Sequence, residues 1–112
     1  MGVTAENVAK KYNIDRTQQQ EFAISSHEKA NNADTNGKFE DEITIIKDKK
    51  VDVMKDGGIR PGTNQEVLSG LKLAVDNNGT VTAGTSSPLT DGAAATLICE
   101  EEYAKSNNLE IL

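Results

Sequence analysis

Apolar residues recur at steps of three and four at the start of the chain, at Ala5, Val8, Ala9 and Tyr12. This spacing predicts a short helix with a narrow apolar stripe. Thr4 is the expected N-cap, and Glu6 would then lie in the first turn, where the helix dipole favours a negative charge. Asn13 is the expected end of this helix.

A second helix is predicted from Arg16 to about Asp34. Asp15 and Gln18 have the spacing of a capping box, in which each side chain bonds the backbone N–H of the other residue. Apolar residues are sparse along this stretch, so most of the helix should face solvent. Gly37 suits the residue that follows a helix C-terminus.

The middle of the chain predicts a small polar hairpin and a short helix. Residues 43–46 and 51–53 are rich in β-branched residues and are separated by a charged turn, which favours two short strands. Thr63 and Glu66 form a second capping-box pattern, for a helix that ends near Gly70. Residues 76–79, with the sequence Asp-Asn-Asn-Gly, indicate a turn.

Residues 79–95, GTVTAGTSSPLTDGAAA, combine a short β-branched run with a loop of small and hydroxylated residues. Residues 80–82 predict a strand, and residues 84–90 predict a loop in which a ligand can approach backbone amides and hydroxyls. Residues 93–99 form an apolar run that fits a strand buried on both faces or a buried helix. A final helix is expected from Glu100 to Ser106, followed by a break at Asn107.

Composition limits both the core and the partners. In 112 residues, 36% are hydrophobic and 4% aromatic, so one modest domain with a thin core is expected. The net charge of −6 argues against nucleic acid or an anionic membrane surface as a partner. A single cysteine fits a reducing compartment, and the N-terminal residues lack the apolar core of a signal peptide. We therefore expect a soluble, cytoplasmic protein.

The block at residues 79–95 resembles the thiolase family, the enzymes that make or cleave 3-ketoacyl-CoA. The opening MGVTAEN resembles a second thiolase stretch, and residues 58–61 and 71–72 fall where thiolases carry similar residues. The resemblance covers essentially the whole chain, which corresponds to an internal segment of a thiolase subunit. It implies an α/β, partial thiolase-like fold: residues 1–78 would belong to the loop domain that covers CoA, with helices and a small hairpin. Residues 79–112 would return into the N-terminal core domain as a strand and a helix.

The same resemblance implies a CoA-binding role for residues of the loop. Ser87 stands where thiolases have a serine that hydrogen-bonds the pantetheine arm of CoA, and a hydroxyl suits the amides of that arm because it both donates and accepts. Ser86 and Ala83 would line the same groove. Without the resemblance, a serine beside Pro88 is an ordinary turn residue.

Arg60 is the candidate for the phosphate end of CoA, since a guanidinium binds phosphate in two-pronged fashion, although alone it would be a surface arginine. Val67 and Val75 stand where thiolases place a serine near the adenine and a phenylalanine. Both valines depart from the family pattern and weaken the implied adenine site. Met1 stands at the place of an acyl-pocket methionine, and it is also simply the first residue.

The catalytic groups of thiolases, two cysteines and a histidine in a Gly-His-Pro context among them, have no counterpart in this chain. His27 lies on a polar helix, where a solvated role is expected. Cys99 lies in an apolar run, where free cysteine behaves as a small buried hydrophobe. No catalytic residue, zinc site or cofactor is expected, and a CoA thioester would be the substrate of the parent enzyme.

The sequence thus predicts a thiolase segment that supplies CoA-binding residues and not the catalytic ones. The parent would be a homo-oligomer acting in 3-ketoacyl-CoA thiolysis or acetoacetyl-CoA synthesis, and the isolated chain would bind CoA weakly or not at all and turn nothing over. Two alternatives remain: a non-catalytic CoA- or lipid-binding protein derived from a thiolase, and a short product that only associates with an intact subunit.

Overall fold

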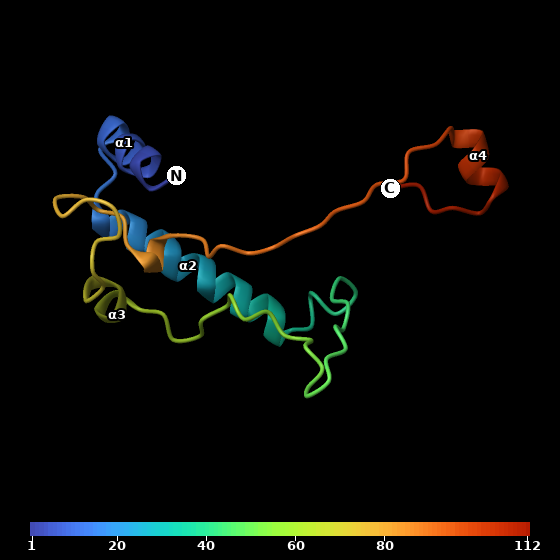
Figure 1. Cartoon of the computed structure of the whole chain (residues 1–112), viewed down its shortest axis with the longest axis horizontal. Helices are drawn as coiled ribbons and strands as arrows, with labels where there is room; N and C mark the ends of the chain where they lie inside the picture. The colour runs from blue at the N-terminus through green and yellow to red at the C-terminus, as the bar shows by residue number, and fades with distance from the viewer.

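Helix α2, Arg16–Thr35, forms the axis of the larger part of the fold, and the computed structural model describes residues 1–112 around it. Helix α1, Gly2–Tyr12, the short α3, Gln65–Ser69, and the 3-10 helix η1, Ala83–Thr85, gather about its N-terminal half (Figure 1). Both α3 and η1 contact α2 directly. A long connector then leads away to α4, Glu101–Ser106, which lies apart from the other helices (Figure 1).

The predicted limits of α2 are confirmed. The Asp15 side chain accepts a hydrogen bond from the Gln18 N–H at 2.9 Å, and Gln18 Oε1 accepts one from the Asp15 N–H at 3.0 Å. This capping box satisfies two N–H groups at the helix start. Gly37 follows the C-cap with a φ of 68°, in the left-handed region that glycine enters without strain.

Helix α1 begins earlier than predicted. Its N-cap is Met1, so the expected Thr4 cap is wrong, and Glu6 lies one turn further along than expected. The early start brings Gly2 against Val75, at a place where an added Cβ would overlap the valine side chain. Glycine therefore permits this close approach. The helix ends as predicted at Asn13, which has a φ of 54°.

The core is small, in agreement with the composition. Six of 112 residues are buried, namely Ala9, Gln20, Leu68, Val81, Thr82 and Ala104. Five of the six lie in or around the α1, α2, α3 and η1 group, and the sixth lies in α4. Large apolar side chains elsewhere, such as Phe22 and Leu97, are exposed. Order in this chain thus depends on polar contacts as well as on apolar burial.

Arg16 holds α3 against α2. Its Nη2 donates to the carbonyls of Leu68, Ser69 and Leu71 at 3.2, 3.0 and 2.7 Å. The Leu68 and Ser69 carbonyls lie in the last turn of α3 and that of Leu71 lies just beyond it, where the helix dipole favours a cation. A guanidinium with several donors can satisfy them together.

The N-cap of α3 is Asn64, so the capping box predicted for Thr63 is wrong. Asn64 Oδ1 accepts from the Val67 N–H at 3.0 Å, which is the bond that an N-cap makes. The Thr63 hydroxyl instead donates to the Arg60 carbonyl at 2.8 Å. The helix ends at Gly70, as predicted.

The predicted strands are reduced to two single bridges, so the observed elements are helical. Ile46 and Val53 exchange two hydrogen bonds of 2.9 Å, at the place of the expected hairpin. Leu73 and Thr82 form the other bridge, at the place of the strand expected over residues 80–82. An isolated two-stranded hairpin is marginal in water, and no further strand lies beside either pair.

The strand or buried helix predicted for residues 93–99 is wrong. These residues form no regular structure and are exposed, as Ile98 at 88% shows. Cys99 is exposed too, contrary to the buried position expected for it. No strand pairs with this segment, and an extended segment without a paired strand has no backbone partner except water. The final helix is confirmed at Glu101–Ser106. No helix combines the length and the apolar character needed to cross a membrane.

Candidate functional site

The loop after η1 presents the two serines singled out by the sequence. Thr85 Oγ1 accepts from the Thr82 N–H at 3.1 Å, and the Ser86 hydroxyl donates to the Thr82 carbonyl at 2.8 Å. Ser86 is therefore engaged in holding the loop. The Ser87 hydroxyl is exposed and makes no hydrogen bond within the chain, so it is free to meet a ligand.

Gly84 fixes this loop on the core. A Cβ at Gly84 would stand 2.5 Å from Leu68 and 2.6 Å from Leu71, closer than side-chain carbons approach one another. Thr82, at the start of η1, is completely buried. The loop is thus anchored at its base while Ser86 and Ser87 stay exposed.

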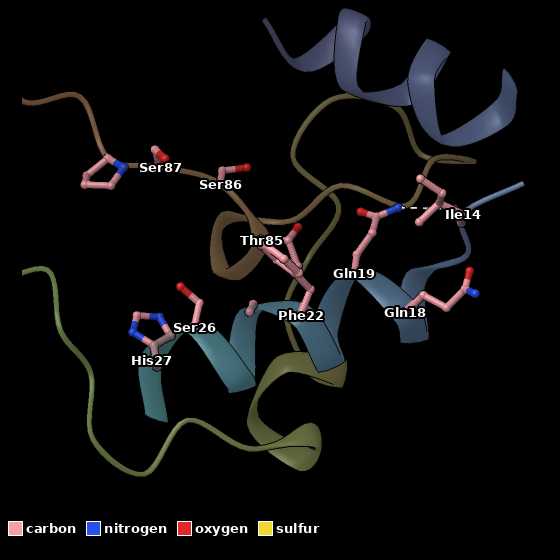
Figure 2. A pocket seen from close by; sticks show the side chains of 11 residues that line it. Ile14, Gln18, Gln19, Phe22, Ser26, His27, Thr85, Ser86 and Ser87 are labelled. Carbon is pink, nitrogen blue, oxygen red and sulfur yellow. Dashed lines mark hydrogen bonds between the residues drawn. The ribbon is translucent and has the colours of Figure 1, made fainter. Parts of the chain in front are cut away.

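One groove runs between the loop and α2, and its cavity volume is about 570 Å³. The side chains of Ser26 and His27 rise from α2 toward the segment that carries Ser86 and Ser87 (Figure 2). We call this cavity the α2 groove. Its lining residues are Ile14, Gln18, Gln19, Phe22, Ala23, Ser26, His27, Thr85, Ser86, Ser87 and Pro88.

A second groove lies on the other side of the same loop, against α1, with a cavity volume of about 800 Å³. We call it the α1 groove. It is more apolar, and Met1 lies in its wall, as do Val8, Val81 and Leu89. Ser86 and Ser87 line both grooves, so the loop forms a ridge between a mixed surface and an apolar one.

Arg60 reaches the α2 groove through its backbone. Its N–H donates to His27 Nδ1 at 3.3 Å, and the His27 ring lines the groove. The Arg60 N–H thus bonds the histidine in the wall of the α2 groove, while Arg60 itself is not among the residues that line the cavity. His27 was expected to be solvated, but it is half-buried. His27 lies four residues after Ala23, a spacing that puts both on one face of the helix and could have indicated that His27 lines the groove.

The other predicted residues do not line either groove. Val67 is 56% exposed on α3, and Ala83 is exposed within η1. Val75 is 42% exposed and packs against Gly2. The structure therefore places Ser86 and Ser87 in both grooves and Met1 in the α1 groove. Arg60 contacts only the His27 wall of the α2 groove, and these three residues lie outside both grooves. Their assignment to CoA remains a prediction.

Glu6 ties α1 to the segment before the loop. Its carboxylate accepts from the Val81 N–H at 2.9 Å, from the Thr80 N–H at 2.9 and 3.1 Å, and from the Thr80 hydroxyl at 3.1 Å. The Val81 N–H is the largest cause and lowers the pKa of Glu6 below its ordinary value. Desolvation opposes this shift, and the N–H and hydroxyl of Thr80 lower the pKa further. This carboxylate fixes α1 to Val81, which lies in the wall of the α1 groove.

The chain brings no nucleophile and base together. Its one histidine is in α2, whereas Cys99 precedes α4, which lies far from α2 (Figure 1). No three His, Cys, Asp or Glu side chains are grouped so that they could hold a metal ion. The groups that the site presents are the free Ser87 hydroxyl and an apolar wall, and both suit the binding of a ligand.

The thiolase N-terminal domain model matches residues 1–102, so this chain belongs to the thiolase family. It is 44% identical to the peroxisomal 3-ketoacyl-CoA thiolase 1 of Arabidopsis thaliana over 100% of its own length and 28% of that protein. A 3-ketoacyl-CoA thiolase of Shewanella loihica is 48% identical, over 99% of this chain and 30% of the relative. The chain thus spans less than a third of the length of these relatives.

Solved structures show the same likeness. The acetyl-CoA acetyltransferase of Bacillus anthracis superposes with a TM-score of 0.84 and 41% identity, over 98% of this chain and 29% of that one. Human mitochondrial 3-ketoacyl-CoA thiolase, solved in complex with CoA, gives a TM-score of 0.87 and 37% identity, over 96% and 27%. The arrangement of this chain therefore corresponds to part of the thiolase fold.

Proposed function

We propose that this chain supplies part of the CoA-binding surface of a thiolase that transfers acyl groups between CoA thioesters. The reaction is 3-ketoacyl-CoA thiolysis or acetoacetyl-CoA synthesis. Membership of the family supports this proposal, as does the CoA bound in the human mitochondrial structure. The substrate is a CoA thioester, with no further cofactor.

The observation that carries the proposal is the free hydroxyl of Ser87 on a ridge between two grooves. The pantetheine arm of CoA contains amides that need both donors and acceptors, and a hydroxyl supplies both. Its acyl end is apolar and would suit the α1 groove, where Met1 lies in the wall. The tether would then cross the ridge at Ser87.

Charge supports the same orientation. CoA is anionic, and the chain carries a net charge of −6, so a local cation is needed at the phosphate end. Arg60 lies beyond the His27 wall of the α2 groove. We assign Arg60 to the phosphates and Ala83 to the groove of Ser86 and Ser87. Val67 and Val75 are assigned to the adenine end, as the weaker part of the assignment.

We infer the organisation of the parent protein from the resemblance to the family. Residues 1–78 are assigned to the loop domain that covers CoA, and residues 79–112 to the return into the N-terminal core. A homo-oligomer is proposed for the parent, in keeping with the dimeric peroxisomal thiolase of Saccharomyces cerevisiae, which is 44% identical over 75% of this chain. We propose the cytoplasm as its compartment.

The 112-residue chain itself is expected to show no turnover, because no nucleophile and base meet in it. The measurement is acyl transfer between CoA thioesters, with a radiolabelled acetyl donor to reveal any acyl-enzyme. Transfer above the blank, or label on Cys99, would contradict this expectation.

The binding role is tested in a segment-exchanged enzyme, in which residues 1–112 replace the matching segment of the Bacillus anthracis acetyltransferase. Ser87→Ala should raise the KM for CoA about 2- to 10-fold, since one neutral hydrogen bond contributes about 0.5–1.5 kcal/mol. Ser69→Ala is the matched control, because its hydroxyl donates only to the Glu66 carbonyl of its own helix. Equal KM values for both variants would refute the role of Ser87.

A non-catalytic CoA- or lipid-binding role is the second candidate, favoured by the size and apolar walls of the α1 groove. Displacement of a fluorescent fatty acid from the chain tests it. Displacement by free fatty acid but not by CoA would favour the lipid-binding role over the thiolase role.

A further inference from the structure

The segment that carries Arg60 is held by a single distant hydrogen bond. Residues 54–63 are mostly exposed and contain three glycines, at 57, 58 and 62. Their other hydrogen bonds are local, as from the Gly58 N–H to Asp56 Oδ1. The bond from the Arg60 N–H to His27 Nδ1 spans 33 residues of sequence and joins this segment to α2.

His27 is well placed to act as a fixed acceptor. The ring is half-buried, rises from a stable helix and lines the α2 groove (Figure 2). Because Nδ1 accepts the Arg60 N–H, the neutral ring carries its proton on Nε2. The tautomer and the orientation of the ring are thus set by the same contact that holds the segment.

We propose that His27 is a positioning residue, which holds the Arg60 segment at the edge of the α2 groove so that the guanidinium meets the phosphate end of CoA. This inference rests on the proposed function of the groove. A segment already fixed near its bound position loses less conformational entropy when the ligand binds. His27 would therefore strengthen binding of the phosphates without touching them.

The bond between the Arg60 N–H and His27 is tested first in the free chain, where NMR measures the exchange rate of the Arg60 amide hydrogen. His27→Ala removes the acceptor, and alanine keeps α2 because it is the best helix former. Exchange of the Arg60 amide should become about 2- to 10-fold faster, the range for one neutral hydrogen bond. His27→Asn should stay near the wild type, because the asparagine Oδ1 can stand where Nδ1 was. Glu28→Ala, an exposed neighbour, is the control.

The effect on recognition is tested in the segment-exchanged enzyme, with CoA or pantetheine as acyl acceptor. Pantetheine lacks the nucleotide and its phosphates. His27→Ala should raise the KM for CoA about 3- to 10-fold and leave kcat and the KM for pantetheine unchanged. In an Arg60→Ala background, which keeps the backbone N–H but lacks the guanidinium, His27→Ala should have no further effect.

Several results would overturn the inference. An equal rise of KM for CoA and for pantetheine would mean that His27 acts on the pantetheine arm or on folding. A full rise of KM in the Arg60→Ala background would mean that His27 acts independently of Arg60. An unchanged exchange rate of the Arg60 amide in His27→Ala would show that the bond to His27 does not hold the Arg60 segment. The proposed function fails differently: Ser87→Ala and Arg60→Ala would then both leave the KM for CoA unchanged.

Discussion

Removing the Glu6 carboxylate should loosen α1 from the segment that leads into the serine loop. The carboxylate accepts from three donors, the Val81 N–H, the Thr80 N–H and the Thr80 hydroxyl. Val81 is buried, so its N–H would be left without a partner in Glu6→Ala. Hydrogen bonds to a charged group contribute about 1.5–3 kcal/mol each, and solvent screening at this half-exposed carboxylate lowers the total expected cost to about 1–2 kcal/mol.

The assay is local, because this cost concerns one contact between α1 and residues 80–81. Amide hydrogen exchange at Val81 reports the free energy of opening of that contact. A cost of about 1–2 kcal/mol corresponds to exchange that is about 5- to 30-fold faster. Glu21→Ala removes the same charge from an exposed position of α2 and should leave exchange at Val81 unchanged.

The dependence on pH follows from the lowered pKa of Glu6. A carboxyl whose pKa is lower in the folded state than in the unfolded state stabilises the fold above its unfolded value of 4.5. That stabilisation is lost as the pH falls through the folded pKa. The difference in exchange between wild type and Glu6→Gln should therefore shrink in acid. A difference that stays constant from neutral pH down to acid would refute the reasoning.

Three further predictions follow from packing, capping and exposure. Gly84→Ala should lower the melting temperature, at a cost of about 1–3 kcal/mol, because the added Cβ would overlap Leu68. Gly92→Ala is the control, because its Cβ meets nothing within 4 Å and the melting temperature should stay unchanged. Asp15→Ala should cost about 0.5–2 kcal/mol of helix stability, measured as loss of helical circular dichroism on heating, and an unchanged transition would contradict the capping role. Cys99 should react with a thiol reagent equally fast in the folded and urea-unfolded chain, and protection in the folded chain would contradict its exposure.

The sequence determined the elements whose cause is local. The capping box of Asp15 and Gln18 and the glycine at position 37 fixed α2 within one residue of its observed end, because both act through the backbone groups of a single helix. The resemblance to thiolases, read from residues 79–95, also identified the family correctly. The free hydroxyl of Ser87 is consistent with the role that the resemblance implies.

Tertiary structure alone decided what depends on neighbours distant in the chain. An apolar run becomes a strand only if another strand supplies hydrogen-bond partners, and residues 93–99 have none beside them. Thr4 is not the N-cap because α1 begins three residues earlier, at a position where Gly2 contacts the distant Val75. His27 lines the groove because residues 85–88 lie against α2, and its ring gains a partner because Arg60, 33 residues further on, folds back onto this helix. Local patterns specify a helix, but the distant partners of a side chain are fixed only by the tertiary structure, which brings separate segments into contact.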